Sequence, residues 1–293
     1  MPMHSGATVN KIYKPIVKLT KLGEMAVKKA FDYLKSLRPD DKLKKELNII
    51  REFTVQDFKL KYKNSVIGYF WSLLNPLLML ITLYVVFSII MKLEIPYYQL
   101  FLLLGIILWN FISESTNASI DSIISKGNII RKIRFPAYTI VISACLASLI
   151  SLFLNLVVFS IFMIAFRVKL GIASLLFPLY LFELAILVCG ISFILCGVYV
   201  KFRDIKHIWN FLLLLLFWLS PIVYPESRIP IAYRNWYMLN PLARLINGSR
   251  DALIYSYLPE VKQVLITSII CIAVLLIGIR VFKKFTPLIA EEI

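Results

Sequence analysis

Six long apolar runs constrain the fold of this chain more than any other feature. They are residues 69–91, 98–120, 138–166, 172–200, 208–224 and 261–282. A helix of about 20 apolar residues crosses a hydrocarbon core of about 30 Å. Helices are expected because a strand in lipid would leave its backbone groups without hydrogen bonds. The sequence therefore predicts an all-α membrane protein with six transmembrane helices.

The composition supports this prediction. Hydrophobic residues make up 59% of the 293 positions and charged residues 17%, against about 45–50% and about 25% in soluble domains. Such an apolar excess excludes a soluble single-domain enzyme, because large exposed apolar patches aggregate. The four cysteines lie inside apolar runs without a Cys-x-x-Cys pair. We interpret them as buried small hydrophobic residues rather than as metal ligands or disulfides.

Positive charge is distributed unevenly along the chain, whose net charge is +16. Of the 33 Lys and Arg residues, 25 lie in segments 1–68, 121–136, 199–207 and 280–293. Loops rich in Lys and Arg remain on the cytoplasmic side. We therefore expect a plasma-membrane protein with both termini in the cytoplasm. No nucleic-acid-binding motif accompanies the charge, and no nucleic-acid partner is expected.

Three regions follow from this pattern. Residues 1–68 form a basic cytoplasmic leader, 69–282 a six-span domain and 283–293 a cytoplasmic tail. Within the leader, residues 47–62 place apolar side chains at roughly helical spacing, which predicts an amphipathic interface helix. A solvated cytoplasmic helix is the alternative. Between spans five and six, proline and short apolar pieces favour short re-entrant external helices over a simple surface loop.

Motifs for chemistry are absent from the sequence. It contains no phosphate-binding Gly-rich loop and no His-Glu-x-x-His pattern, and it has only two histidines. No carboxylate pair is placed for catalysis at a membrane face. We predict that the chain is not an enzyme and binds no cofactor or metal.

Polar residues inside the predicted spans are candidate functional residues, because charge is costly in lipid. Glu114 and Asn117 belong to a polar stretch of the second span. For Glu114, lining of a pathway and packing between helices are equally favoured. For Glu183 we favour structural pairing. We expect Asn155 to donate a hydrogen bond to another helix.

Tryptophans near the span ends allow two interpretations. Trp71 fits an interfacial aromatic belt. Trp109 and Trp218 fit either that belt or a surface on which sugar rings stack.

Four ordered blocks resemble those of one family, the membrane subunits of ABC-2 type exporters of polysaccharides and polyol phosphates. Residues 56–78 contain Asp57 and Trp71 of the entry signature, and 128–136 resemble a coupling loop. Residues 201–225 and 239–253 are similar to the fifth span and the re-entrant segment. The resemblance runs from about Phe53 to the C-terminus, and the leader is longer than the family pattern.

The resemblance implies the rest of the assembly. Such a subunit forms a homodimer, lies among membrane lipids and binds two copies of a separate ATP-binding subunit, which holds ATP and Mg. The assembly exports lipid-linked glycans such as O-antigen or teichoic acid. Implied docking residues for the ATP-binding subunit are Lys59, Lys63, Asn128, Arg131, Lys132, Arg134 and Phe135. Implied translocation-path residues are Trp71, Trp109, Glu114, Asn117 and Trp218.

Three alternatives stay open at this point. The same architecture could export a drug or a small lipid. A membrane-embedded glycan transferase would need a catalytic carboxylate pair, which the sequence does not show. A passive scaffold would not need polar residues such as Glu114 within the membrane.

Overall fold

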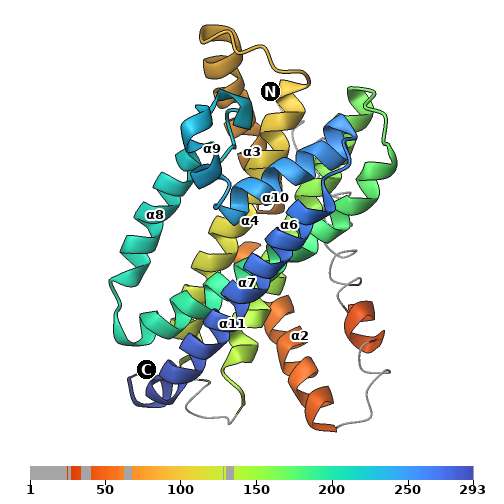
Figure 1. Ribbon diagram of the computed structural model, residues 1–293. Helices are drawn as coiled ribbons and strands as arrows, with labels where there is room; N and C mark the ends of the chain where they lie inside the picture. The colour runs from red at the N-terminus through yellow and green to blue at the C-terminus, as the bar shows by residue number, and fades with distance from the viewer. Residues whose placement is uncertain are drawn as a thin grey trace, which may run out of the picture.

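The computed structural model describes residue 25 and residues 28–33, 41–62, 68–127, 129 and 135–292, and this part of the chain is helical with no strand (Figure 1). The α-helices are α2 (Asp41–Tyr62), α3 (Gly68–Tyr84), α4 (Tyr98–Ser125), α6 (Tyr138–Ala165), α7 (Phe177–Lys201), α8 (Ile205–Leu219), α9 (Ile231–Tyr237), α10 (Pro241–Arg250) and α11 (Val261–Glu292). Short π-helical turns η1 (Val85–Ile90) and η4 (Asp251–Tyr255) extend α3 and α10. Two 3₁₀ turns, η2 (Ile172–Leu176) and η3 (Glu226–Arg228), complete the set.

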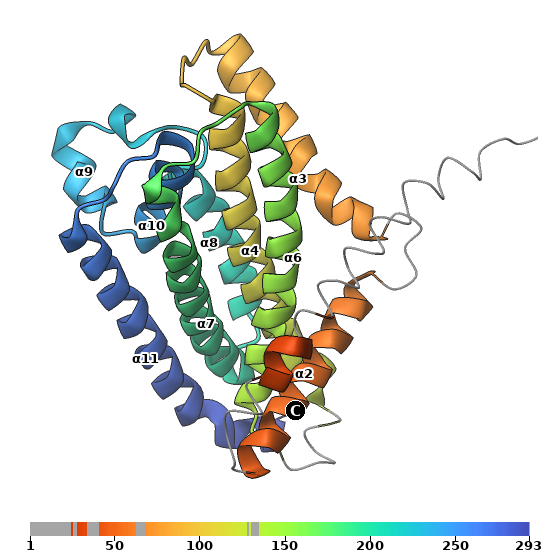
Figure 2. The same cartoon turned by 90° about the vertical axis from the view of Figure 1, so that its right-hand side faces the viewer.

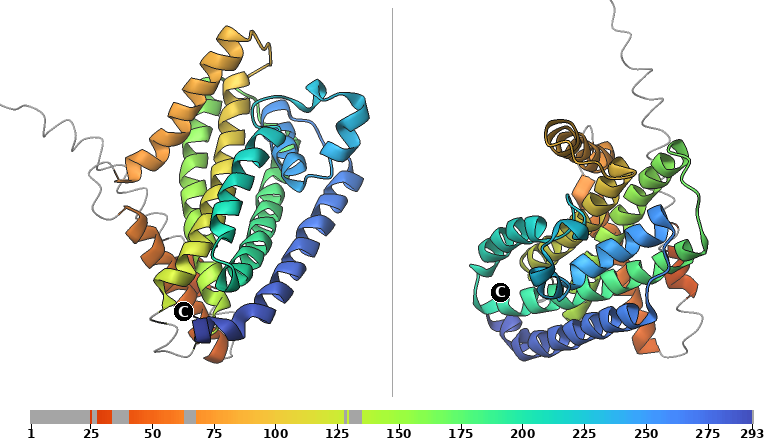
Figure 3. Two further views of the ribbon diagram at one scale, coloured as in Figure 1. Left: turned by 90° about the vertical axis from the view of Figure 1, so that its left-hand side faces the viewer. Right: turned by 45° about the horizontal axis from the view of Figure 1, so that its top comes forward.

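The long helices run alternately up and down in one bundle. In Figures 1 and 2, α2 and the last turns of α11 lie at the bottom, which we call the α2 end. The short helices α9 and α10 lie at the opposite end, which we call the α10 end. Figure 3 shows α3 and α11 on opposite flanks, with α4, α6 and α7 between them.

Five helical segments are long and apolar enough to cross a membrane, where the sequence predicts six. They are Trp71–Ile90, Tyr98–Ser125, Tyr138–Ala165, Ile172–Lys201 and Val261–Pro287. The expected fifth span corresponds to α8, whose 15 residues extend about 22 Å, less than the hydrocarbon core. Ser220 adopts an extended conformation and ends α8, because a residue before proline disfavours the helical region.

Helix α4 forms the centre of the core. Leu102, Leu103 and Leu104 are consecutive and completely buried, which means that apolar partners surround this helix on all sides. Helices α7 and α11 pack closely because glycine faces backbone: a Cβ on Gly190 would lie 2.7 Å from the nitrogen of Leu275. The predicted burial is confirmed for Cys145, Cys196 and Cys271, whereas Cys189 is half-buried.

Candidate functional site

Helix α2 and its neighbours bring together three of the predicted site residues that the structure describes: Lys59, Glu114 and Phe135. Helix α2 begins at Asp41, six residues before the predicted start. Ile50, Thr54 and Phe58 follow at four-residue intervals and are buried, Phe58 completely. Residues four apart share one helix face, and Phe58 packs against Ala147 and Ile150 of α6. The predicted helix is therefore present and its buried face lies against the bundle, while its place at the membrane interface stays a prediction.

A buried ion pair joins α2 to the end of α4. Lys126 Nζ lies 2.5 Å from Asp57 Oδ2, and the two side chains are 5% and 20% exposed. Lys126 also lies over the ring of Phe53, with Nζ 4.7 Å from the centroid. Removal from water disfavours charge, so burial raises the pKa of Asp57 and lowers that of Lys126, while each partner opposes the other's shift. Removing either side chain of this pair would leave the other charge buried without a partner, which destabilises a folded protein.

A second ion pair places Glu114 against α2. Lys61 Nζ lies 2.6 Å from Glu114 Oε1, and both side chains are about one-third exposed. Lys61 also donates to Ser151 Oγ of α6 at 3.1 Å. Glu114 therefore contributes to the packing of α2 on α4. The pathway role predicted for it is compatible with this contact and stays a prediction.

The polar stretch of α4 faces other helices of the chain. Ser115, Thr116 and Ser119 are completely buried. Thr116 Oγ1 accepts a hydrogen bond of 2.9 Å from Trp209 Nε1 of α8. Asn117 is half-buried, and its Oδ1 has no hydrogen-bond partner among the described residues. This stretch joins α4 to α8 inside the bundle.

The predicted path tryptophans lie in different environments. Trp71 on α3 and Trp218 on α8 are about half exposed. Trp109 is buried, and its ring meets that of Phe217 edge-on at 5.7 Å between centroids. Phe217 also contacts Trp218 edge-on. The structure thus groups Trp109 with Trp218 through Phe217, while Trp71 stands on the exposed face of α3.

Only part of the predicted docking set is described. Lys59 is exposed near the end of α2. Phe135 packs edge-on against Phe53 of α2, with centroids 5.5 Å apart. This contact brings the segment before α6 to the same end as α2. The remaining members of the set lie outside the described residues: Lys63, Asn128, Arg131, Lys132 and Arg134.

Two other predicted polar residues have partners. Ser268 of α11 donates a hydrogen bond to Glu183 Oε1 of α7, which agrees with structural pairing. The expectation for Asn155 is wrong, because its Nδ2 donates to the Ser151 carbonyl four residues back on the same helix. A helix offers the i−4 carbonyl at hydrogen-bond distance to a polar side chain.

Arg250 is a residue that the sequence reasoning did not identify. Its guanidinium is buried at 1% exposure between α10, α4 and the segment after α8. It donates to the carbonyls of Phe101 and Ile222, each at 2.9 Å, and to that of Pro221. The sequence feature that could have identified Arg250 is its position four residues after Ile246, on the apolar face of α10.

The same arginine depends on Gly105 for space. A Cβ at Gly105 would overlap Arg250 Nη2. The guanidinium also lies over the ring of Phe101, 3.4 Å from the centroid. Arg250 thus holds the short α10 to the centre of the bundle with hydrogen bonds and a cation–π contact.

Metal-ligating side chains do not gather in the described ranges. No group of three His, Cys, Asp or Glu residues there could hold a metal ion. The expectation that this chain binds no cofactor stays a prediction.

Comparison with known proteins gives a consistent result. Residues 50–254 match the family model described as ABC-2 type transporter. An O-antigen export system permease protein RfbA of Klebsiella pneumoniae is 29% identical over 239 residues, which cover 81% of this chain and 92% of the relative. RfbA of Myxococcus xanthus is 27% identical, with the same coverage of both chains. The polysialic acid transport protein KpsM of Escherichia coli is 26% identical over 78% of this chain and 90% of its own.

Proposed function

The chain belongs to the ABC-2 type transporter family, and from that premise we propose that it is the membrane subunit of an exporter of lipid-linked polysaccharide. The observation that carries the proposal is the similarity to O-antigen and polysialic acid transport proteins over most of both chains. ATP hydrolysis on a separate subunit drives the transport. This chain supplies the route through the membrane and has no ATPase site of its own.

The proposed topology has six crossings. Helix α7 ends at the α2 end and α11 starts at the α10 end, so α8 returns the chain across the bundle (Figure 1). The buried residues after Leu219 lengthen this crossing. Helices α9 and α10 then form re-entrant segments. By the distribution of Lys and Arg, the α2 end and both termini face the cytoplasm, and the membrane is the plasma membrane.

The proposed assembly is a homodimer that binds two ATP-binding subunits, which hold ATP and Mg. The docking surface consists of Lys59 on α2, Phe135 before α6 and the basic residues between α4 and α6. Contacts of α2 with α4 and α6 support this role, because a rigid connection transmits displacement into the bundle. Two arrangements of the bundle, biased by nucleotide on the partner, would alternate during transport.

The proposed path runs between the two protomers. Trp71 and Trp218 offer exposed aromatic faces on which sugar rings can stack. Trp109, Glu114 and Asn117 lie deeper in the protomer, and they reach the path when the two protomers move relative to one another. The names of the relatives favour a glycan over a drug or small lipid as cargo, and they favour transport over glycan transfer.

The proposal is tested by purifying the tagged chain from its native membrane under mild conditions and identifying what accompanies it by mass spectrometry. We expect an ATP-binding subunit in equal amount and a bound glycolipid. Recovery of glycan-synthesis enzymes without an ATPase would overturn the proposal. A stable ATPase complex that carries a drug or a simple lipid instead would overturn the cargo alone.

A further inference from the structure

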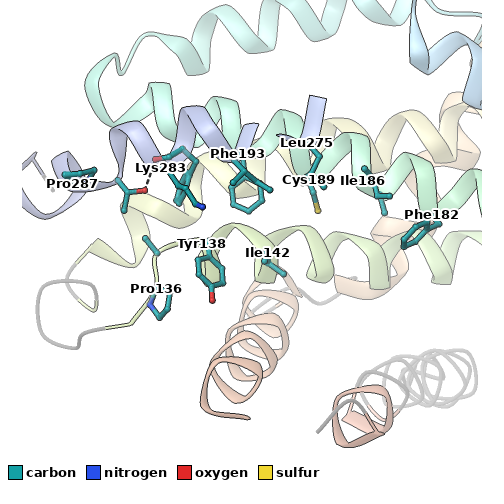
Figure 4. Close-up of a pocket in the computed structure, with 15 residues that line it drawn as sticks. Pro136, Tyr138, Ile142, Phe182, Ile186, Cys189, Phe193, Leu275, Lys283 and Pro287 are labelled. Atoms are coloured by element: carbon teal, nitrogen blue, oxygen red, sulfur yellow. Dashed lines mark hydrogen bonds between the residues drawn. The ribbon is translucent and has the colours of Figure 1, made fainter. Parts of the chain in front are cut away.

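An apolar groove lies between α6, α7 and α11, and none of the four residues of the two α2 ion pairs lines it. Its volume is about 820 Å³, within the range of about 300–1,000 Å³ of pockets that bind small molecules. Figure 4 shows Tyr138 and Ile142 of α6 facing Cys189 and Phe193 of α7 across it. Lys283 lies near the α2 end of the groove and Phe182 at its other end.

The walls of the groove suit a hydrocarbon chain. Most of the lining side chains are apolar, and the larger ones include Ile142, Phe182, Ile186, Phe193, Leu275 and Ile279. All three helices that form the groove belong to segments long enough to cross a membrane, so it lies at the depth of the acyl chains. An empty groove would forfeit dispersion contacts along its walls. A flexible acyl chain restores those contacts at little cost in shape.

The charge at the groove's end suits an anionic headgroup. Of the fifteen described residues that line it, Lys283 is the one with a charged side chain. Arg280 and Lys284 are exposed on the neighbouring turn of α11. Near the same end, the Tyr138 hydroxyl donates to Glu46 Oε2 of α2 at 2.5 Å. A lysine keeps its stem on apolar surface while its ammonium reaches the polar layer.

We propose that this groove binds an acyl chain of an anionic phospholipid whose phosphate contacts Lys283. The apolar walls match the acyl chain of such a lipid, and the positive charge at the end toward the polar layer matches its anionic headgroup. The inference rests on the membrane location of the chain and is independent of the exported cargo.

Lipid retention by the full-length chain tests this site. The protein is loaded with equal amounts of phosphatidylglycerol and phosphatidylcholine, moved into lipid-free detergent, and its retained lipid is measured by mass spectrometry. We expect phosphatidylglycerol to be enriched, and Lys283→Gln to lower that enrichment about fivefold, the factor for one lysine at an anionic lipid surface. Lys262→Gln changes the net charge by the same amount, but Lys262 is exposed at the opposite end of α11 and does not line the groove, so this variant should preserve the enrichment. Equal enrichment in all three proteins would overturn the proposal.

A second variant tests the apolar part of the groove. Ala185 lines it and is half-buried, so Ala185→Phe should fill the space and lower the retention of both lipids. Helix content and elution volume show whether the variant is folded. Unchanged retention in folded Ala185→Phe protein would refute the assignment.

Cys189 provides a test on the unaltered chain. It lines the groove, so phosphatidylglycerol with a maleimide on its acyl chain should modify Cys189, and peptide mass spectrometry identifies the modified residue. Failure to modify Cys189 would count against the proposal. Cross-linking of Cys189 between two copies by a short bifunctional thiol reagent would show that a second chain occupies the groove, and it would overturn the lipid assignment.

Discussion

The ammonium of Lys126 and the carboxylate of Asp57 meet at 2.5 Å across 69 positions of sequence. Together with the Lys61–Glu114 pair, this contact makes α2 part of the bundle. A helix held in this way moves with α4 and α6. The first two predictions concern these two ion pairs.

Breaking the Asp57–Lys126 pair should destabilise the protein. Asp57→Asn leaves Lys126 buried without its opposite charge, and we expect the free energy of unfolding to fall by about 3 kcal/mol. Lys126→Met should have a similar effect. The double variant Asp57→Leu with Lys126→Met should be more stable than the two single effects predict, because it leaves no buried charge. Thermal unfolding of the purified chains measures all three, and strictly additive effects would contradict the account.

Variants of the Lys61–Glu114 pair distinguish a role of Glu114 in helix packing from a role in transport. Both side chains are about one-third exposed, so losing the pair should cost about 1 kcal/mol or less. Lys61→Met breaks it and leaves Glu114 in place, while Glu114→Leu removes the acid. If Glu114 lines the path, export should fail in Glu114→Leu and continue in Lys61→Met. Normal export by stably inserted Glu114→Leu protein would exclude a path role.

Arg250 should be essential for stability. Arg250→Met leaves three buried carbonyls without their donor, and the free energy of unfolding should fall by about 3 kcal/mol or more. Gly105→Ala should act similarly, because the pinned guanidinium cannot yield to the new methyl group. Arg228→Met is the control, since Arg228 is exposed. Denaturation midpoints similar to that of the control would disprove the role of Arg250.

Asp251, the residue after Arg250, should make stability depend on pH. Burial raises its pKa from 3.8 to about 6, with a further contribution from Glu226. A raised carboxyl pKa means that the folded protein binds the proton more tightly than the unfolded chain does. The stability that protonated Asp251 contributes is therefore present below about pH 4 and is lost as the pH rises through 6. Asp251→Asn should therefore stabilise the protein at pH 7 and have little effect at pH 4.

Melting temperatures over this pH range compare Asp251→Asn with the parent chain. Asp204→Asn serves as the control, because Asp204 is exposed and the change in formal charge is the same. A constant difference between Asp251→Asn and the parent from pH 4 to pH 7 would argue against the buried carboxyl as its source.

Charge reversal tests the docking surface. Arg131→Glu with Arg134→Glu should abolish association with the ATP-binding subunit, and export with it, while insertion into the membrane is retained. Arg228→Glu with Lys262→Glu reverses two exposed charges at the α10 end and should leave association intact. Co-purification of the two subunits measures the result. Intact association of the Arg131/Arg134 variant would show that the loop does not dock.

Several features could be predicted because they depend on local sequence. Apolar runs predicted the bounds of the first four long helical segments to within five residues, whereas α11 continues ten residues past its predicted end. The spacing of Ile50, Thr54 and Phe58 places them on the buried face of α2. The predicted fifth span ends five residues beyond α8, because apolar content continues past the point where Ser220 and Pro221 end the helix. Because the apolar residues continue after the helix has ended, the length of the apolar run overestimates the length of α8.

The candidate site also has features that could be predicted from local sequence and features that could not. Glu114 could be recognised as unusual from its place in an apolar run, but its partner Lys61 could not. Arg250 went unrecognised because its contacts with Phe101 span 149 positions, and no local pattern encodes such a distance.

The sequence by itself determined that this is a helical multi-pass membrane protein of the ABC-2 type transporter family, because length, hydropathy and ordered motifs are properties of the chain read in order. Only the tertiary structure decided which charges are paired, which polar residues face inward, and how α10 is held to α4. Those contacts join residues that are far apart in sequence, and their energies depend on burial and distance, which exist only when the helices have packed.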